Sequence, residues 1–294
     1  MVLTAATLWA LNGAVSKVIL KSGGVSSERL TEVRATGAFL LLFGVLLVVR
    51  RSTLRVSLRE LPFLVVFGIG GLAFVAWFYF VAIERLEIGI ALLIQYIAPV
   101  LVALWARYVL HEPVRRRIWA ALGLSILGLA LLVEIWQGLE LDGIGLLASL
   151  GAAVTFALYI LLADRGLRTR STSSLLAYGF LFAAIFWATV QPWTSFPWGL
   201  LNDSVSLLGR LDGIELPVWL LMAWMVVLGT IVPFGLLVAS LRHVTATRAG
   251  ILAMFEPVAG TVIAYAWLRE ELDPTQLAGA AVVLAAIGLA QTAR

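Results

Sequence analysis

The sequence predicts an all-α integral membrane protein with ten transmembrane helices, arranged as two inverted repeats of five helices each. Three observations predict this fold class. Hydrophobic residues make up 62% of the 294 residues and charged residues only 13%, whereas soluble domains are about half apolar and about a quarter charged. Apolar stretches recur along the whole chain, and the first half resembles the second. So much apolar surface cannot be buried inside a globule of this length, so lipid must cover it.

Ten apolar stretches are each long enough to cross the hydrocarbon core as a helix, which takes about 20 residues. They are residues 2–20, 30–49, 61–83, 88–110, 118–136, 144–163, 174–192, 217–240, 249–268 and 275–290. The first stretch lacks the basic start and the small-residue cleavage site of a signal peptide, so we expect it to be a retained helix.

The fourth and ninth stretches carry the repeat on which the arrangement of halves depends. Residues 82–112 and 240–270 align without a gap at a shift of 158 residues, and each has one proline in the middle and a closing glutamate. Five helices per half is an odd number, so the second half enters the membrane in the opposite direction. Such inverted repeats are typical of secondary transporters. We expect the halves to be residues 1–137 and 138–294.

Lysine and arginine are divided unevenly between the two sides of the predicted bundle. With the N-terminus inside, 13 of the 21 basic residues lie on the inner side and five on the outer side. Inner loops of membrane proteins are enriched in positive charge. Both termini and the loops at 50–60, 115–117 and 165–170 are therefore expected on the cytoplasmic side of a bacterial inner membrane. The segments at 137–143 and 193–216 are expected outside.

Several functions are excluded by what the sequence lacks. The chain has no cysteine and only two histidines, His111 and His243, neither with the neighbours of a metal site. It contains no zinc-binding HExxH, no GxSxG elbow and no phosphate-binding loop. We therefore expect no enzyme, no cofactor and no metal. The net charge of +4 is explained by the inner loops, so no nucleic-acid partner is expected.

The matching pieces of a known family are LWALNGAVSK at 8–17, the lone Arg34, the two long repeats, and the stretches 123–132 and 278–290. With these residues the chain resembles the drug/metabolite transporter superfamily, specifically its EamA-type ten-helix members. The resemblance implies two inverted five-helix repeats, a central pocket, and export or exchange of small metabolites, often amino acids. This chain departs from the pattern because Ala98-Pro99 stands where the second repeat has Glu256-Pro257.

Ionisable side chains inside a span are costly and are therefore candidate functional residues. Glu256 lies near the membrane midplane, where burial favours the neutral carboxyl and makes it a candidate proton carrier. The alternative is that it only bonds a backbone group freed by Pro257. Arg34 is expected to bind an anionic group of the substrate, because its planar fork suits carboxylates. The alternative is that Arg34 reaches to the interface, and Glu32 is expected to pair with Arg29.

Uncharged polar residues near mid-membrane complete the predicted site. Asn12, Gln95 and Tyr159 are too polar to face lipid, so they either line a pocket or form interhelical hydrogen bonds. We favour the pocket for Asn12 and Tyr159, because they are related at a repeat shift of 147 residues. Trp77 and Tyr96 are expected to form apolar walls.

Three prolines lie at mid-span, namely Pro99, Pro233 and Pro257. A proline inside a helix removes one backbone hydrogen bond and kinks or breaks the helix. The kink is either static or a hinge, and the matched positions of Pro99 and Pro257 favour a hinge.

Together these features predict a secondary-active exporter or exchanger that works by alternating access. Its expected substrate is a small amphipathic metabolite, with amino acids or related compounds favoured. The expected partners are this substrate, the lipid bilayer and a proton as coupling ion, and a homodimer is left open. The alternative is an intramembrane enzyme or lipid-handling protein built on the same scaffold.

Overall fold

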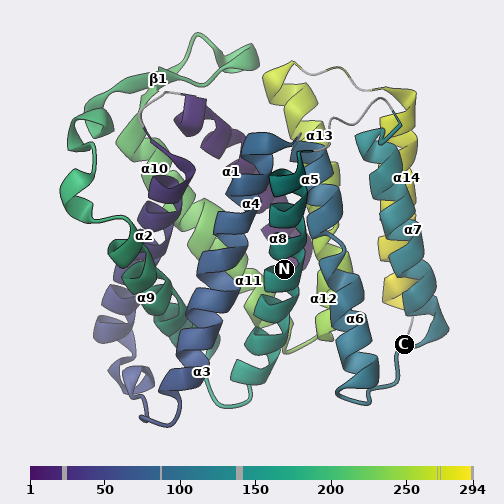
Figure 1. Ribbon diagram of the computed structural model, residues 1–294, viewed down its shortest axis with the longest axis horizontal. Helices are drawn as coiled ribbons and strands as arrows, with labels where there is room; N and C mark the ends of the chain where they lie inside the picture. Colours follow the sequence, from purple (N-terminus) through teal and green to yellow (C-terminus); the bar gives the residue numbers. More distant parts are fainter. Residues whose placement is uncertain (22–24, 87, 137–141, 270, 272, 293–294) are drawn as a thin grey trace.

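The computed structural model describes residues 1–21, 25–86, 88–136, 142–269, 271 and 273–292. Long helices run side by side in a single bundle, and irregular segments cross its two ends (Figure 1). The first half contains α1 (Val2–Lys21), α2 (Ser27–Val49), η1 (Arg51–Leu54), α3 (Leu61–Val66), η2 (Phe67–Ala73), α4 (Phe74–Arg85), α5 (Ile88–Gln95), α6 (Ala98–Tyr108) and α7 (Arg116–Val133). The second half contains α8 (Gly143–Gly166), α9 (Thr172–Val190), η3 (Trp193–Ser195), η4 (Trp198–Asn202), β1 (Ser204–Ser206), η5 (Gly209–Leu211), β2 (Glu215–Pro217), α10 (Val218–Val226), η6 (Val227–Ile231), α11 (Val232–Ser240), α12 (Ala246–Ala253), α13 (Phe255–Leu268) and α14 (Pro274–Thr292).

Ten helical spans in the described part of the chain are long and apolar enough to cross a membrane. They are Val2–Leu20, Ser27–Val49, Leu61–Arg85, Gly89–Tyr108, Arg116–Val133, Gly143–Gly166, Thr172–Val190, Val218–Ser240, Ala246–Trp267 and Pro274–Thr292. Each overlaps one of the ten predicted stretches. Helices satisfy their own backbone polar groups, which is what a span through lipid requires. The prediction of an all-α integral membrane protein with ten spans is confirmed.

The fourth and ninth spans are each broken in the middle. The first helix of the fourth span, α5, ends at Gln95, and the first helix of the ninth, α12, ends at Ala253. Pro99 and Pro257 follow each of these ends by four residues. Because proline has no N–H, the carbonyl groups four residues before it lose their helical partner. The prolines therefore place the two breaks at corresponding positions.

The third and eighth spans each contain a π-helical turn, η2 and η6. A glycine in each turn admits a polar residue of a neighbouring helix. A Cβ atom at Gly71 would lie 3.2 Å from the Cα atom of Tyr159, and one at Gly229 would lie 2.0 Å from Asn12 Oδ1. Only glycine lets these helices approach so closely.

The helices α2 and α9 pack together along the bundle, and hydrogen bonds fasten both ends of the pair. At one end, Arg29 Nη1 donates to the Gln191 carbonyl oxygen, just after α9, at 3.2 Å. At the other end, Ser174 Oγ donates to the Thr53 carbonyl oxygen, just after α2, at 2.7 Å. The hydroxyl of Tyr178 does the same to the next carbonyl. The first turns of α2 thus bind the segment that follows α9, and the first turns of α9 bind the segment that follows α2.

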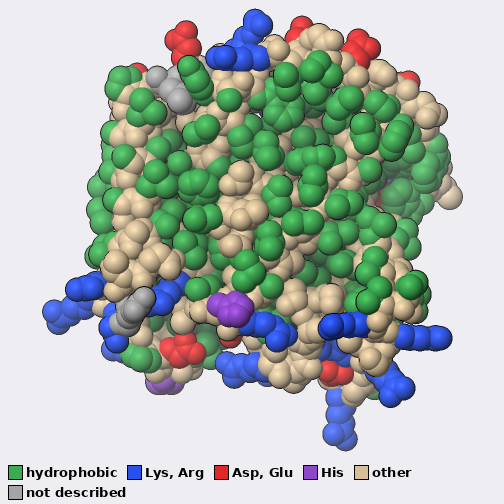
Figure 2. All heavy atoms as spheres, turned by 180° about the vertical axis from the view of Figure 1, so that it is seen from behind, with side chains coloured by type: hydrophobic (Ala, Val, Ile, Leu, Met, Phe, Trp, Pro, Cys, Tyr) green, Lys and Arg blue, Asp and Glu red, His purple; other side chains and the backbone are tan. Residues whose placement is uncertain are grey.

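Basic side chains gather at one end of the bundle, at the bottom of Figure 2, while hydrophobic side chains cover the middle of the visible face. We call this the basic end; the loops that follow α2, α6, α8 and α11 lie there. The expected outer segment between α9 and α10 lies at the opposite end.

That segment folds into a short antiparallel hairpin, in which Ser204 pairs with Pro217. We call residues 204–217 the end hairpin. Two contacts join it to α13, because Trp267 Nε1 donates to the Leu207 carbonyl oxygen at 2.8 Å and the Arg210 guanidinium lies 5.4 Å from the Tyr265 ring centre.

Candidate functional site

A cavity of about 320 Å³ lies within the bundle and is bounded by residues from seven helices. We call it the central cavity. Its polar lining consists of Asn12, Ser16, Lys17, Arg34, Tyr79, Glu84, Gln95 and Glu256. Its apolar lining consists of Trp9, Gly13, Leu20, Val75, Ala76, Phe80, Ile83, Phe156 and Phe234. Four of the seven residues predicted from sequence, Asn12, Arg34, Gln95 and Glu256, therefore surround one cavity.

Glu256 enters the cavity at the break of the ninth span, in the first turn of α13. The Tyr96 hydroxyl, from the break of the fourth span, donates a 2.6 Å hydrogen bond to Glu256 Oε2. Tyr96 itself is completely buried. Its position differs from the apolar wall expected from sequence, because its hydroxyl reaches a carboxyl oxygen rather than only packing its ring.

Arg34 reaches the cavity from α2 and is only 9% exposed. Its Nε donates to Thr230 Oγ1 at 3.1 Å, and its guanidinium lies 5.8 Å from the Phe80 ring centre. Across the described residues, no carboxylate lies within ion-pair distance of Arg34. Glu32 pairs with Arg29 at 2.7 Å, as predicted. The guanidinium thus faces inward with hydrogen-bonding capacity to spare, since it carries five N–H donors.

Two amide side chains belong to the lining of the same cavity. Asn12 and Gln95 are 7% and 8% exposed. Within the described part of the chain, Asn12 Oδ1, Gln95 Oε1 and the nearby Ser16 Oγ are buried without a hydrogen-bond partner. A buried polar atom left unpaired costs about 1–3 kcal/mol. Asn12 Oδ1 lies against Gly229, and none of the three oxygens has surface exposed to the cavity.

Tyr159 lies beside the cavity rather than on its lining. It is completely buried, and its ring centre lies 5.3 Å from that of Phe234 and 6.2 Å from that of Phe156. These two phenylalanines line the cavity. Tyr159 therefore belongs to an aromatic layer that supports the cavity wall, and this layer also includes Phe67.

Trp77 does not line the central cavity. The residues of α4 that do are Val75, Ala76, Tyr79, Phe80 and Ile83. Glu84 lines the cavity from α4 as well. With 3.6 residues per turn these lining positions cover about half of the helix circumference, and position 77 falls just outside that half. There Trp77 packs against Trp187, with ring centres 6.5 Å apart.

Helical spacing could have found the lining residues that sequence reasoning missed. On α1, the face of Asn12 also carries Trp9, Gly13, Ser16 and Lys17, which are three, one, four and five residues away from Asn12.

A second cavity of about 520 Å³ shares five lining residues with the central cavity and extends toward α7 and α14. The shared residues are Trp9, Gly13, Lys17, Tyr79 and Glu256. The face of α1 that points away from lipid therefore lines both cavities.

An all-α bundle of ten spans around an internal cavity with both cationic and acidic groups is the architecture of a membrane transporter. The chain belongs to the EamA-like transporter family, whose model matches residues 1–134 and 143–292. Members of this family transport molecules rather than transform them, so the chain is a multi-pass membrane transporter.

Two similar proteins are also named as transporters. The threonine/homoserine exporter RhtA of Escherichia coli K12 is 28% identical over 229 residues, which cover 77% of this chain and 70% of RhtA. An uncharacterized transporter of Archaeoglobus fulgidus is 27% identical over 218 residues, covering 72% of this chain and 70% of its own. A solved crystal structure superimposes with a TM-score of 0.75 at 21% identity, covering 98% of this chain and 93% of that chain. This last likeness concerns the fold alone.

Proposed function

We propose that this transporter is a secondary-active exporter or exchanger of small zwitterionic metabolites, with amino acids or related compounds as its substrates. The observation that carries the proposal is the placement of Arg34 and Glu256 around one small cavity. The substrate class of RhtA, threonine and homoserine by its name, supports the same chemistry.

The cavity offers complementary groups for both charges of an amino acid. The Arg34 guanidinium is suited to the α-carboxylate, which it can bind through two parallel N–H bonds. Glu256 is suited to the α-ammonium, which carries three N–H donors. Apolar residues such as Val75 and Phe80 remain for the side chain.

The size of the cavity restricts the substrate further. Its volume of about 320 Å³ is at the lower end of the roughly 300–1,000 Å³ typical of ligand pockets. A small or medium amino acid fits this volume.

Alternating access is the proposed mechanism, and the two halves supply its moving parts. The matched breaks of the fourth and ninth spans and the π-turns of the third and eighth spans are positions where helices bend easily. The central cavity reaches Leu20 and Ile83 toward the end that carries the end hairpin. The aromatic layer of Phe156, Tyr159 and Phe234 lies on its other side. Inverted repeats in many secondary transporters rock around such a site.

Proton coupling is proposed to run through Glu256. A carboxyl group in this buried position can exchange its proton when the hydrogen bond from Tyr96 is rearranged. Substrate and proton would then compete for the same carboxylate, which is a simple way to couple export to the proton gradient.

Proteoliposomes give the direct test. The purified transporter is reconstituted and supplied with radiolabelled threonine, homoserine and alanine, with and without a proton gradient. We expect counterflow of at least one of these amino acids, accumulation driven by the gradient, and chemically unchanged substrate on the far side. A neutral sugar and a dipeptide serve as control solutes. Absence of flux for every zwitterion, or recovery of a chemically altered product, would refute the proposal.

The proposed orientation places the basic end in the cytoplasm, with both termini there. It rests on the positive-inside pattern and on the gathering of basic side chains at one end (Figure 2). The chain lacks cysteine, so Ser52→Cys at the basic end and Gly199→Cys at the hairpin end can be compared on intact cells. An impermeant thiol reagent should label only Gly199→Cys. Labelling of Ser52→Cys from outside would reverse the orientation.

A further inference from the structure

A third and larger cavity lies at the basic end, and the transport site does not use it. Its volume is about 1620 Å³. It lies between the end of α6 and the end of α8, and residues 241–247, the connection from α11 to α12 and the first turn of α12, form its floor. In the described part of the chain it shares no lining residue with the central cavity. We call it the basic-end groove.

One side of the groove is apolar and opens toward lipid. Its residues are Leu101, Leu104 and Trp105 from α6, and Val154, Leu158 and Leu161 from α8. Trp105 is 48% exposed and Val154 is 58% exposed, both within membrane spans. Acyl chains of the surrounding bilayer can therefore reach this side directly.

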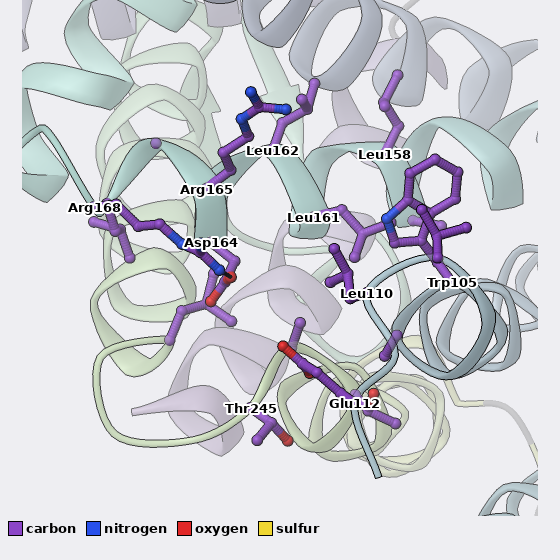
Figure 3. A pocket seen from close by; sticks show the side chains of 18 of the residues that line it. Trp105, Leu110, Glu112, Leu158, Leu161, Leu162, Asp164, Arg165, Arg168 and Thr245 are labelled. Carbon is purple, nitrogen blue, oxygen red and sulfur yellow. Dashed lines mark ion pairs between the residues drawn. The ribbon is translucent and has the colours of Figure 1, made fainter. Parts of the chain in front are cut away.

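The other side carries cationic groups (Figure 3), where Arg165 and Arg168 lie apart from the cluster of Trp105, Leu110 and Leu161. Two of the arginines that line the groove are already paired, Arg168 with Asp164 at 3.9 Å and Arg170 with Glu60 at 3.0 Å. Other ionisable residues that line it are His243 and the exposed Glu112.

Three further arginines have no ion pair with any described residue. They are Arg59, Arg165 and Arg242, and we call them the arginine rim. One of them, Arg242, donates from Nη2 to the Arg170 carbonyl oxygen at 3.3 Å. The Arg170 side chain binds Glu60, the sequence neighbour of Arg59. The rim therefore holds an excess of positive charge at the level where the spans end.

This combination selects one kind of occupant. A soluble anion would not need an apolar slot open to lipid, and a neutral lipid would not need three arginines. We propose that the basic-end groove binds one anionic phospholipid, with its phosphodiester at the arginine rim and one acyl chain along the apolar side. Basic pockets between spans attract anionic headgroups in this way. The site is independent of the transported substrate.

Native mass spectrometry of the detergent-purified transporter tests the headgroup preference. The protein is offered equal amounts of phosphatidylglycerol and phosphatidylethanolamine with the same acyl chains. We expect the parent to retain phosphatidylglycerol about tenfold better. The double variant Arg59→Gln/Arg165→Gln should lose most of that preference. The matched control, Arg51→Gln/Arg116→Gln, removes two exposed arginines of the same end that do not line the groove, and it should behave like the parent.

Equal retention of the two lipids by the parent would overturn the proposal. So would an unchanged preference in the rim variant, provided that its melting temperature and gel-filtration profile match those of the parent. Displacement of the lipid by millimolar glycerol 3-phosphate would also overturn it, because the groove would then be a site for a soluble phosphate.

Fluorescence locates the acyl chain. Phosphatidylglycerol with brominated acyl chains, added in stoichiometric amount in detergent, should quench part of the tryptophan emission of the parent. The quenching should disappear in Trp105→Phe and persist in Trp219→Phe, which removes an exposed tryptophan of α10. Equal quenching in the parent and in Trp105→Phe would show that the chain does not lie in the groove.

Discussion

The broken fourth and ninth spans have the same geometry but different chemistry. Gln95 and Ala253, the last residues before the breaks, are 158 residues apart, as are Pro99 and Pro257. At the intervening matched position the fourth span has Ala98 and the ninth has Glu256. The fourth span breaks without any carboxylate. The break therefore depends on the proline, and Glu256 is not required to make it.

The two breaks also meet each other, since the Tyr96 hydroxyl from one donates to Glu256 from the other. At the position that matches Tyr96, the ninth span has Met254, which has no comparable donor. One half thus supplies the hydroxyl and the other supplies the carboxylate. The comparison teaches that the break is repeated while the carboxylate stands in one span only, which favours a role of Glu256 in transport over a role in shaping the helix.

The largest expected effect tests that asymmetry directly. Glu256→Gln keeps the shape and the hydrogen bond with Tyr96 but removes titration. Proton-driven uphill transport in proteoliposomes should fall to background, whereas substrate exchange, which needs no net proton movement, should survive. The control Glu215→Gln changes an exposed carboxylate of β2 and should leave both activities unchanged. Uphill transport at the parent rate by Glu256→Gln would end the coupling hypothesis.

Arg34 is the cationic counterpart of Glu256 in the lining of the cavity. Arg34→Lys keeps the charge but loses the bidentate fork, which should weaken apparent substrate affinity by about 1–3 kcal/mol, roughly 5- to 150-fold. Arg34→Ala should abolish transport while the yield of folded protein stays unchanged. Flux measurements over a range of substrate concentrations check this, with Arg107→Lys, on an exposed part of α6, as the matched control. Parent-like kinetics in both Arg34 variants would show that the guanidinium binds no substrate.

The contact between the breaks is expected to have an intermediate effect. Tyr96→Phe removes the hydroxyl that binds Glu256, and a hydrogen bond to a charged group contributes about 1.5–3 kcal/mol. Apparent affinity and the pH dependence of flux should both change. In a double-mutant cycle with Glu256→Gln the effects should not add, because the Gln variant already replaces the charged acceptor of this hydrogen bond by a neutral one. Fully additive effects would show that the two breaks work independently.

The smallest effect concerns the basic end of the α2–α9 pair. The Ser57 backbone N–H and the Arg170 guanidinium hold the pKa of Glu60 below its ordinary value of 4.5. A carboxyl group with a lowered pKa stabilises the folded state above its unfolded pKa, and this contribution is lost as the pH falls through the folded value. Glu60→Gln should therefore lower the melting temperature slightly at pH 7 and not at pH 3. A difference that persists at pH 3 would assign the effect to packing.

At the other end of the α2–α9 pair, Arg29 is bound to Glu32, which is buried. Replacement of Arg29 should therefore lower the melting temperature more than replacement of Glu60.

The fold could be predicted because the length of the apolar stretches and the distribution of Lys and Arg between the loops are patterns that extend over many residues. Each span needs only enough apolar residues, and proline breaks a helix wherever it stands. Arg34 and Glu256 could be found because ionisable groups are rare in lipid. Tyr79 could not, since aromatic residues are common on every side of α4. Trp77 was expected at the cavity for the same reason, and only packing shows that its ring lies against Trp187 instead. The π-turns at Gly71 and Gly229 also depend on tertiary approach rather than on local pattern.

The end hairpin is joined to the same helix that carries Glu256. Trp267 and Tyr265 lie near one end of α13 and Glu256 lies near the other, so α13 connects the central cavity to the end hairpin. A pivot of α13 at its break must either carry the hairpin with it or pull Trp267 off the Leu207 carbonyl. A nanobody that binds the hairpin should therefore restrain α13, and a fluorophore attached to the exposed Ser204 should report a pivot of that helix as a change in emission.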